Sequence, residues 1–265
     1  MILMSVSLII PAFAGWLSGF IVNYLAEVLP ITRTLSWPVC HECHQNYRTV
    51  DYLALRPCIN GHRRSRRTWF TAFLVMAASV YIWFEPPEKL GYILGMMLVT
   101  YFAVVFVIDL EHRLILHPTS LAGAILGFIV GLTAHDLTST LIGGFSGLTI
   151  MLAFYALGML FTRYRANRMR AAGHEQDEEE ALGAGDVILA TILGLILGWP
   201  LIWFGLLFGI LLGGLVSLLI VVWLVGSRRY KENALMMFIP YGPYFLSSAF
   251  LIIFFPGWVA GIVPG

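Results

Sequence analysis

The sequence predicts an all-α polytopic membrane protein with about eight transmembrane helices. Of its 265 residues, 59% are hydrophobic and only 12% are charged, whereas a soluble domain is about 45–50% apolar and about 25% charged. A core of this size cannot hide such an excess of apolar side chains. The composition therefore argues against a soluble globular enzyme, a disordered chain and a disulfide scaffold. The net charge of +1 carries no signature of a nucleic-acid partner.

Eight apolar runs account for this composition, since a spanning helix needs about 20 apolar residues. The first run lacks the basic region and cleavage site of a signal peptide, so we expect it to stay in the membrane. Three parts follow: a first transmembrane helix (1–29), a polar loop (30–67) and a transmembrane core (68–265). The runs cover residues 3–29, 68–84, 90–108, 117–134, 139–161, 186–198, 200–225 and 239–262.

Basic residues give the expected orientation. Polar connections at 30–67, 109–117, 162–185 and 226–238 alternate with very short ones, as the two sides of a membrane require. Fifteen of the sixteen Lys and Arg residues lie on the side of these four connections, and Lys89 is the exception. The positive-inside rule places that side in the cytoplasm and both termini outside. The lipid bilayer is therefore an expected partner.

Two aspartates stand at the cytoplasmic edge of apolar runs. Asp109 ends the third run and Asp186 opens the sixth. Ionisable groups at membrane depth are costly and usually functional. Two close carboxylates share a proton, so one activates water while the other polarises a carbonyl, as in aspartic peptide hydrolysis. Alternatively, Asp186 is an ordinary helix N-cap and Asp109 an interfacial residue at a helix end.

The polar loop carries a second cluster of reactive side chains. Cys40 and Cys43 form a C-x-x-C pair, fourteen residues separate Cys43 from Cys58, and His62 follows four positions later. Three thiolates and one imidazole suit a tetrahedral structural zinc site, here a small cytoplasmic zinc knuckle. The loop is too short and polar to fold around its own core, so a metal would supply its stability. The alternative is a set of reduced thiols without metal. Two other histidines are rival ligands, His41 and His44.

Several segments carry a resemblance to a known family. The Gly-x-Gly-Asp sequence at 183–186 resembles the second active-site motif of the prepilin peptidases, integral-membrane aspartic proteases of the GxGD type. The sequence at 109–112 resembles their first aspartate motif, and 239–244 resembles the Pro-aromatic-Gly-Pro segment that enters their last span. The sequence at 19–30 resembles their first helix. The resemblance covers the whole chain in the right order.

The resemblance implies a membrane-embedded aspartic endopeptidase of the inner (plasma) membrane. Its catalytic pair would be Asp109 and Asp186, and its substrates would be type IV prepilin or pseudopilin precursors, cleaved at the cytoplasmic face. Glycine next to Asp186 would let the backbone approach a substrate strand. The motif residues expected to position the substrate are Gly183, Gly185, Pro240, Gly242 and Pro243.

The chain also departs from the family pattern. Pro118 lies nine rather than seven residues after Asp109, Ile188 replaces a frequent lysine, and Gly61 stands where the family has a fourth cysteine. In bifunctional members the same protein N-methylates the new N-terminus with S-adenosylmethionine. Here the loop runs straight into Trp69, without the Pro and Glu common in methylating members, so methylation and its cofactor stay open.

Two other function classes remain as alternatives. A proton- or cation-coupled transporter would also use intramembrane carboxylates, and a zinc-stabilised membrane scaffold would have no catalytic pair. The acidic run at 177–180 is either a solvated stretch or an attractor of basic residues in a substrate leader. The sequence leaves open which pilins are processed, which aspartate is the base, the identity of the metal and the oligomeric state.

Overall fold

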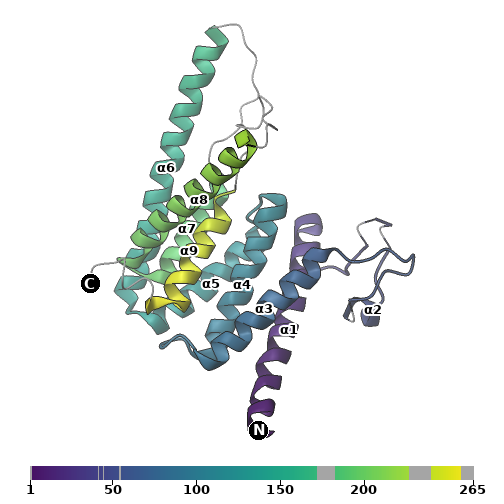
Figure 1. Ribbon diagram of the computed structural model, residues 1–265. Coiled ribbons are helices and arrows are strands. Elements are labelled where there is room, and N and C mark those ends of the chain that lie inside the picture. The colour runs from purple at the N-terminus through teal and green to yellow at the C-terminus, as the bar shows by residue number, and fades with distance from the viewer. Residues whose placement is uncertain are drawn as a thin grey trace. The chain divides into compact units, whose positions relative to one another are not determined.

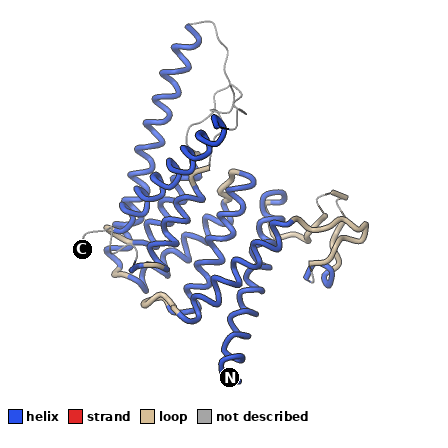
Figure 2. Tube along the Cα trace, in the orientation of Figure 1, coloured by secondary structure: helices blue, strands red, loops and turns tan. Residues whose placement is uncertain are grey.

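A computed structural model describes residues 2–40, 42–43, 45–53, 55–171, 183–226 and 240–257. Within these ranges the chain is helical, with no strand and one isolated bridge between Val39 and Asn46 (Figure 2). The predicted all-α class is confirmed. The chain divides into two compact units, Met1–Gly123 and Ala124–Gly265, and each is described by itself.

The first unit is built on three long helices that pack against one another (Figure 1). Helices α1 and α3 approach so closely at Gly19 that a Cβ atom there would lie 2.8 Å from the Cα of Ala72. The missing side chain of Gly19 allows this approach. The buried Asn23 amide ties the same two helices together by donating to the carbonyl oxygens of Gly19 (2.9 Å) and Thr68 (3.0 Å). The helices of this unit are α1 (Ile2–Thr32), α2 (Thr49–Leu53), α3 (Arg66–Phe84), α4 (Gly91–His112) and the start of α5 (His117–Ala134).

The second unit surrounds a short apolar helix, α7, which packs against α6, α8 and α9. Side chains such as Leu189 and Ala190 are fully buried. Helix α7 lies in backbone contact with α6. A Cβ atom at Gly143 would collide with the carbonyl oxygen of Gly194, and a Cβ atom at Gly194 would collide with the carbonyl oxygen of Gly143. The helices of this unit, besides most of α5, are α6 (Leu137–Ala171), α7 (Ala184–Leu197), α8 (Leu201–Gly226) and α9 (Gly242–Phe254).

Six of the described helices are long and apolar enough to cross a membrane: α1, α3, α4, α5, α6 and α8. Many of their large apolar side chains face outward, as lipid contact requires. The sixth and eighth predicted runs form the shorter apolar helices α7 and α9, of 14 and 13 residues. At about 1.5 Å per residue each rises about 20 Å, less than a hydrocarbon layer of about 30 Å. The protein is therefore a multi-pass membrane protein.

Candidate active site and metal centre

Asp109 lies in the last turn of α4 and is only 5% exposed. The helix ends four residues later, at Arg113, which adopts the left-handed conformation with φ of 55°. The backbone N–H of Arg113 donates to the carbonyl oxygen of Asp109 at 2.9 Å and closes this turn. A carboxyl group is thus buried at the end of a helix whose other buried side chains are almost all apolar.

Asp186 is the third residue of α7. The N-cap of this helix is Gly183, whose carbonyl oxygen accepts from the backbone N–H of Asp186 at 3.0 Å. The alternative prediction that Asp186 caps the helix is therefore wrong. Its half-buried carboxyl group is placed by the first turn of α7 without serving as the cap.

Gly183 leaves bare backbone beside this carboxyl group. Its φ of −79° is accessible to any residue, so the turn itself does not require glycine. A Cβ atom there would meet only Oδ2 of Asp186 and the backbone nitrogen of Gly185, both at 3.9 Å. The absence of a side chain at this position is therefore not demanded by the packing of the described residues.

The Pro-Tyr-Gly-Pro segment forms the beginning of α9. Tyr241 is the N-cap, Pro243 occupies the first turn, where a missing N–H costs nothing, and Gly242 and Pro243 are buried. Pro240 directly precedes the cap and is partly buried. Because α9 packs against α7, this segment and Asp186 belong to one unit. Asp109 belongs to the other unit.

The predicted metal ligands come together in the loop between α1 and α3. The side chains of Cys40, Cys43, Cys58 and His62 each offer one ligand atom, and these atoms all lie within 4.8 Å of one another. The Sγ atoms of Cys43 and Cys58 are 3.8 Å apart. Nδ1 of His62 lies 3.4 Å from the Sγ of Cys58 and 3.8 Å from that of Cys40. This cluster, called the Cys₃His cluster below, can hold a metal ion.

The spacing of the cluster fits a tetrahedral ion. With metal–sulfur bonds of about 2.3 Å, two sulfurs of a tetrahedron lie about 3.8 Å apart. The other ring nitrogen of His62 lies 3.3 Å from a carboxylate oxygen of Glu42, the partner that usually orients a ligating imidazole. Gly61 takes a positive φ of 82°, so the chain turns between Cys58 and His62. The turn makes His62 the fourth member of the cluster.

The environment of Cys40 favours its thiolate form. Burial opposes ionisation of the thiol, but backbone N–H groups of Cys43 and Glu42 and the neighbouring thiols outweigh it and lower the pKa of Cys40 to about 6. A thiolate is the form that binds a metal ion. The rival ligands His41 and His44, like the acidic run at 177–180, lie outside the described residues.

A sequence model of the type IV leader peptidase family matches residues 96–218, a little under half of the chain. The matched segment is therefore similar to this family. It contains both Asp109 and Asp186, so the predicted resemblance to the prepilin peptidases is confirmed. No curated protein and no solved structure gives a match. The family supports peptidase activity on prepilin-type substrates and does not favour the transporter alternative.

Aromatic and charged residues that support the cluster were not predicted from the sequence. Tyr47 and Tyr52 are buried in one core with Cys40 and Cys58. The guanidinium group of Arg64 lies 4.0 Å from the ring centre of Tyr52 and 5.3 Å from that of Tyr47. Burial raises the pKa of both tyrosines, to about 12 for Tyr47. Two tyrosines beside the cysteine pairs are a weak sequence signal, because loops often contain them.

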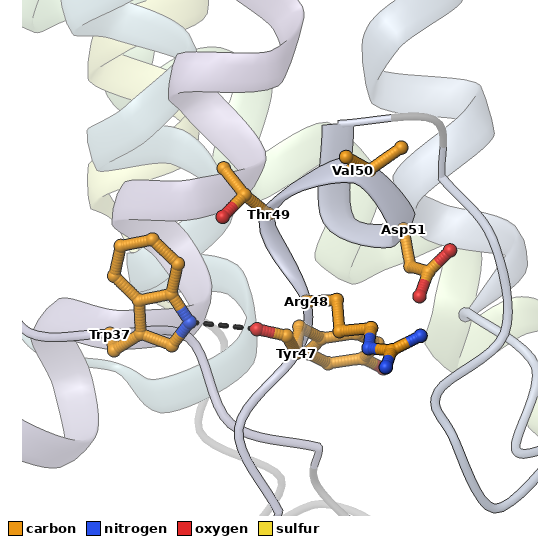
Figure 3. Close-up of a pocket in the computed structure, with 6 residues that line it drawn as sticks. All are labelled: Trp37, Tyr47, Arg48, Thr49, Val50 and Asp51. Carbon is orange, nitrogen blue, oxygen red and sulfur yellow. Dashed lines mark hydrogen bonds between the residues drawn. The ribbon is translucent and has the colours of Figure 1, made fainter.

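A shallow pocket of about 510 Å³ opens on the same loop (Figure 3). The indole nitrogen of Trp37 donates to the backbone oxygen of Tyr47 at 2.7 Å and closes one side of it. Arg48 and Asp51 bring charges of opposite sign to its wall, together with Thr49 and Val50. The pocket belongs to the loop rather than to either aspartate.

Proposed function

We propose that the protein is a membrane-embedded aspartic endopeptidase that removes the leader peptide from type IV prepilin or pseudopilin precursors at the cytoplasmic face of the inner membrane. The observation that carries this proposal is the family match over residues 96–218, which includes Asp109 and Asp186. The proposed orientation follows from the charge distribution of the loops, and the peptidase core is residues 68–265.

The proposed catalytic pair consists of Asp109 and Asp186. With one carboxyl group ionised and the other protonated, the carboxylate takes a proton from water as the water oxygen attacks the scissile carbonyl carbon. The protonated partner donates to the carbonyl oxygen, which becomes the oxyanion of a tetrahedral intermediate. Collapse of this intermediate breaks the C–N bond, and a proton passes to the leaving amine. The pair titrates as a unit.

The two short helices support cleavage below the membrane surface. Helices α7 and α9 pack against each other and have 14 and 13 residues, so neither fills a hydrocarbon layer of about 30 Å. If their C-terminal ends reach the outer interface, their N-terminal ends, with Asp186 and the Pro-Tyr-Gly-Pro segment, lie several ångströms below the cytoplasmic headgroups. A prepilin is cut just before its apolar segment, which starts at this depth.

The bare backbone at Gly183 supports a role in substrate positioning. Extended substrate strands bind proteases through backbone hydrogen bonds, and a glycine that no described side chain packs against allows such an approach. Gly185, Pro240, Gly242 and Pro243 are proposed to shape the same region from the starts of α7 and α9.

We also propose zinc as the ion of the Cys₃His cluster. Three thiolates and one imidazole form a closed tetrahedral set of ligands, which is typical of structural rather than catalytic zinc. The ion would hold the loop together, and the cleavage reaction would not involve it.

The decisive experiment is cleavage of a purified prepilin by the detergent-solubilised protein. We expect Asp109→Asn and Asp186→Asn each to lower kcat by about 10²–10⁴-fold, the usual contribution of a general acid or base. The matched control is Asp136→Asn, at an exposed aspartate before α6, which should cleave like the wild type. Melting temperatures of all four proteins would establish that they are folded.

Two results would overturn the proposal. A folded Asn variant with the wild-type rate would exclude the paired-aspartate mechanism. Absence of cleavage by the wild type, tested on every pilin of its own cell, would exclude the peptidase. In that case proton flux in liposomes, lost in the same two variants, would establish the transporter alternative instead.

A further inference from the structure

A chain of ion pairs connects three helix ends in the first unit. Arg67, in the first turn of α3, donates from Nη2 to Glu27 of α1 at 3.2 Å and from Nη1 to Glu111 of α4 at 2.6 Å. Arg64, just before α3, donates to the other oxygen of Glu27 at 2.6 Å. The order along this ion-pair chain is therefore Arg64, Glu27, Arg67, Glu111.

The members of the ion-pair chain are shielded from water to different degrees. The side chain of Arg64 is 3% exposed, those of Arg67 and Glu27 about one fifth, and that of Glu111 38%. Shielded ion pairs are screened less by salt than surface pairs. Arg67 bridges two carboxylates with two different nitrogens, which the planar guanidinium permits and a lysine ammonium reproduces poorly.

The Arg64 end of the ion-pair chain is held by the loop between α1 and α3. Arg64 lies over the ring of Tyr52 and donates to its backbone oxygen at 3.3 Å. The hydroxyl of Tyr52 in turn donates to Glu27 at 2.9 Å. Because Tyr52 is buried in one core with Cys40 and Cys58, Glu27 is oriented by the same residues that surround the Cys₃His cluster.

The Glu111 end of the ion-pair chain lies in the helical turn that carries Asp109. Glu111 follows Asp109 by two residues, and the helix stops at Arg113. The last turn of a helix is the part most free to fray, since its carbonyl groups have no intrahelical partners. The contact between Arg67 and Glu111 attaches this last turn to the first turn of α3.

We propose that Arg67 is a positioning residue for Asp109: it holds the end of α4 through Glu111 while Glu27 and the cysteine-containing loop hold Arg67 in place. The inference rests on the proposed function, because it concerns the catalytic use of Asp109. Arg67 touches no substrate in this account. Its effect on the reaction passes through the placement of one carboxyl group, where a displacement of about 1 Å can cost about 100-fold in rate.

The test measures kcat and KM of prepilin cleavage for Arg67→Gln, Glu111→Gln and the double variant. We expect each single change to lower kcat about tenfold or more and to leave KM unchanged. The double variant should be no slower than the slower single variant, because both changes break one contact. Arg67→Lys keeps the charge without the planar fork, so its kcat should lie between those of Arg67→Gln and the wild type.

The matched control is Arg66→Gln, because Arg66 is exposed, neighbours Arg67 and has no ion pair among the described residues. A general loss of folding would lower the melting temperature and the active fraction without making the two single effects non-additive. If Arg67→Gln does not fold, Arg67→Lys and Glu111→Gln decide the question.

Two outcomes would overturn the inference: folded variants with the kcat of Arg66→Gln, or effects of the two single changes that multiply. Failure of the proposed function would look different, since the wild type would then not cleave or Asp109→Asn would keep its activity in the same assay.

Discussion

In the loop between α1 and α3, the buried side chains include two tyrosines and two of the cysteines of the Cys₃His cluster. In the α6–α7 pair, by contrast, glycines bring two helix backbones into direct contact, and the buried side chains of α7 are all apolar. The structure of the loop thus depends on a few specific polar side-chain atoms. The packing of the helix pair instead depends on glycines, which have no side chain to keep the two backbones apart.

This difference separates the two regions energetically. A loop held by a single metal ion loses its structure when one ligand is lost. A helix pair packed through small residues is destabilised when a larger side chain is introduced at the contact. Changes in one region should therefore leave the other intact. The four predictions below test this separation, and they are ordered by expected size.

Removal of the proposed zinc ion should have the largest effect, and only on the loop. Structural zinc contributes on the order of 10 kcal/mol to small zinc domains, so a chelator or Cys58→Ser should expose the loop arginines to trypsin. Cleavage after the exposed Arg48 and Arg63 reports this opening, and elemental analysis reports the metal. Asn60→Ser, in the same turn, is the matched control and should keep both metal and protection. Protection that survives full removal of the metal would contradict this view.

Gly194→Ala should destabilise the helix pair without touching the metal. The added methyl group collides with the backbone of Gly143, and such overpacking costs about 1–3 kcal/mol. The melting temperature in detergent should fall while the metal content stays constant. Gly214→Ala, at an exposed position of α8 with no atom within 4 Å of a new Cβ, should not lower it. Equal melting temperatures for the two variants would show that the close approach of α6 and α7 is unimportant.

Gly183→Ala, in the same unit, should lower kcat/KM without lowering the melting temperature. Among the described residues a Cβ there meets no atom closer than 3.9 Å, so we expect the melting temperature not to change. If a substrate strand approaches this backbone, kcat/KM should fall about tenfold, the equivalent of about 1.4 kcal/mol. Ile188→Ala, at a partly exposed residue of the next turn, is the comparison. Wild-type kinetics for Gly183→Ala would remove Gly183 from the proposed site.

Tyr52→Phe should have the smallest effect and again only on the loop. The change removes the hydroxyl that donates to Glu27 at 2.9 Å but keeps the ring beneath Arg64. We expect a loss of about 1 kcal/mol, seen as faster hydrogen exchange in the loop. Tyr164→Phe, at an exposed position of α6, should leave loop exchange unchanged. Faster exchange in α6 and α7 as well would show that the two regions are coupled.

The sequence predicts the helices well but not where they end. The run at 117–134 agrees with α5, because polar residues flank it on both sides. The run at 139–161 is much shorter than α6, which continues to Ala171 through Arg163 and Arg165. Hydropathy marks where apolar side chains stop, whereas a helix stops where its backbone bonds stop. The short helix α2 has no apolar run and was not predicted.

The candidate site was predicted to the extent that its chemistry is local in the sequence. The pattern of Cys40, Cys43, Cys58 and His62 is typical of metal sites, and its members come together as expected. The catalytic pair stays a prediction. The contacts of Arg67 had no sequence signal, because its partners lie 40 and 44 residues away. Nothing in one sequence says which of many charged residues will pair across such a distance.

Helices α7 and α9 are shorter than a typical hydrocarbon layer is thick, so the lipid that reaches their ends must adapt to them. Around such helices the bilayer thins or the protein exposes polar groups, at a cost that rises with acyl-chain length. The proposed peptidase activity should therefore be highest in membranes with short or disordered acyl chains and lower in thicker ones. Membrane composition would then set the rate at which precursors mature, without any change in the protein.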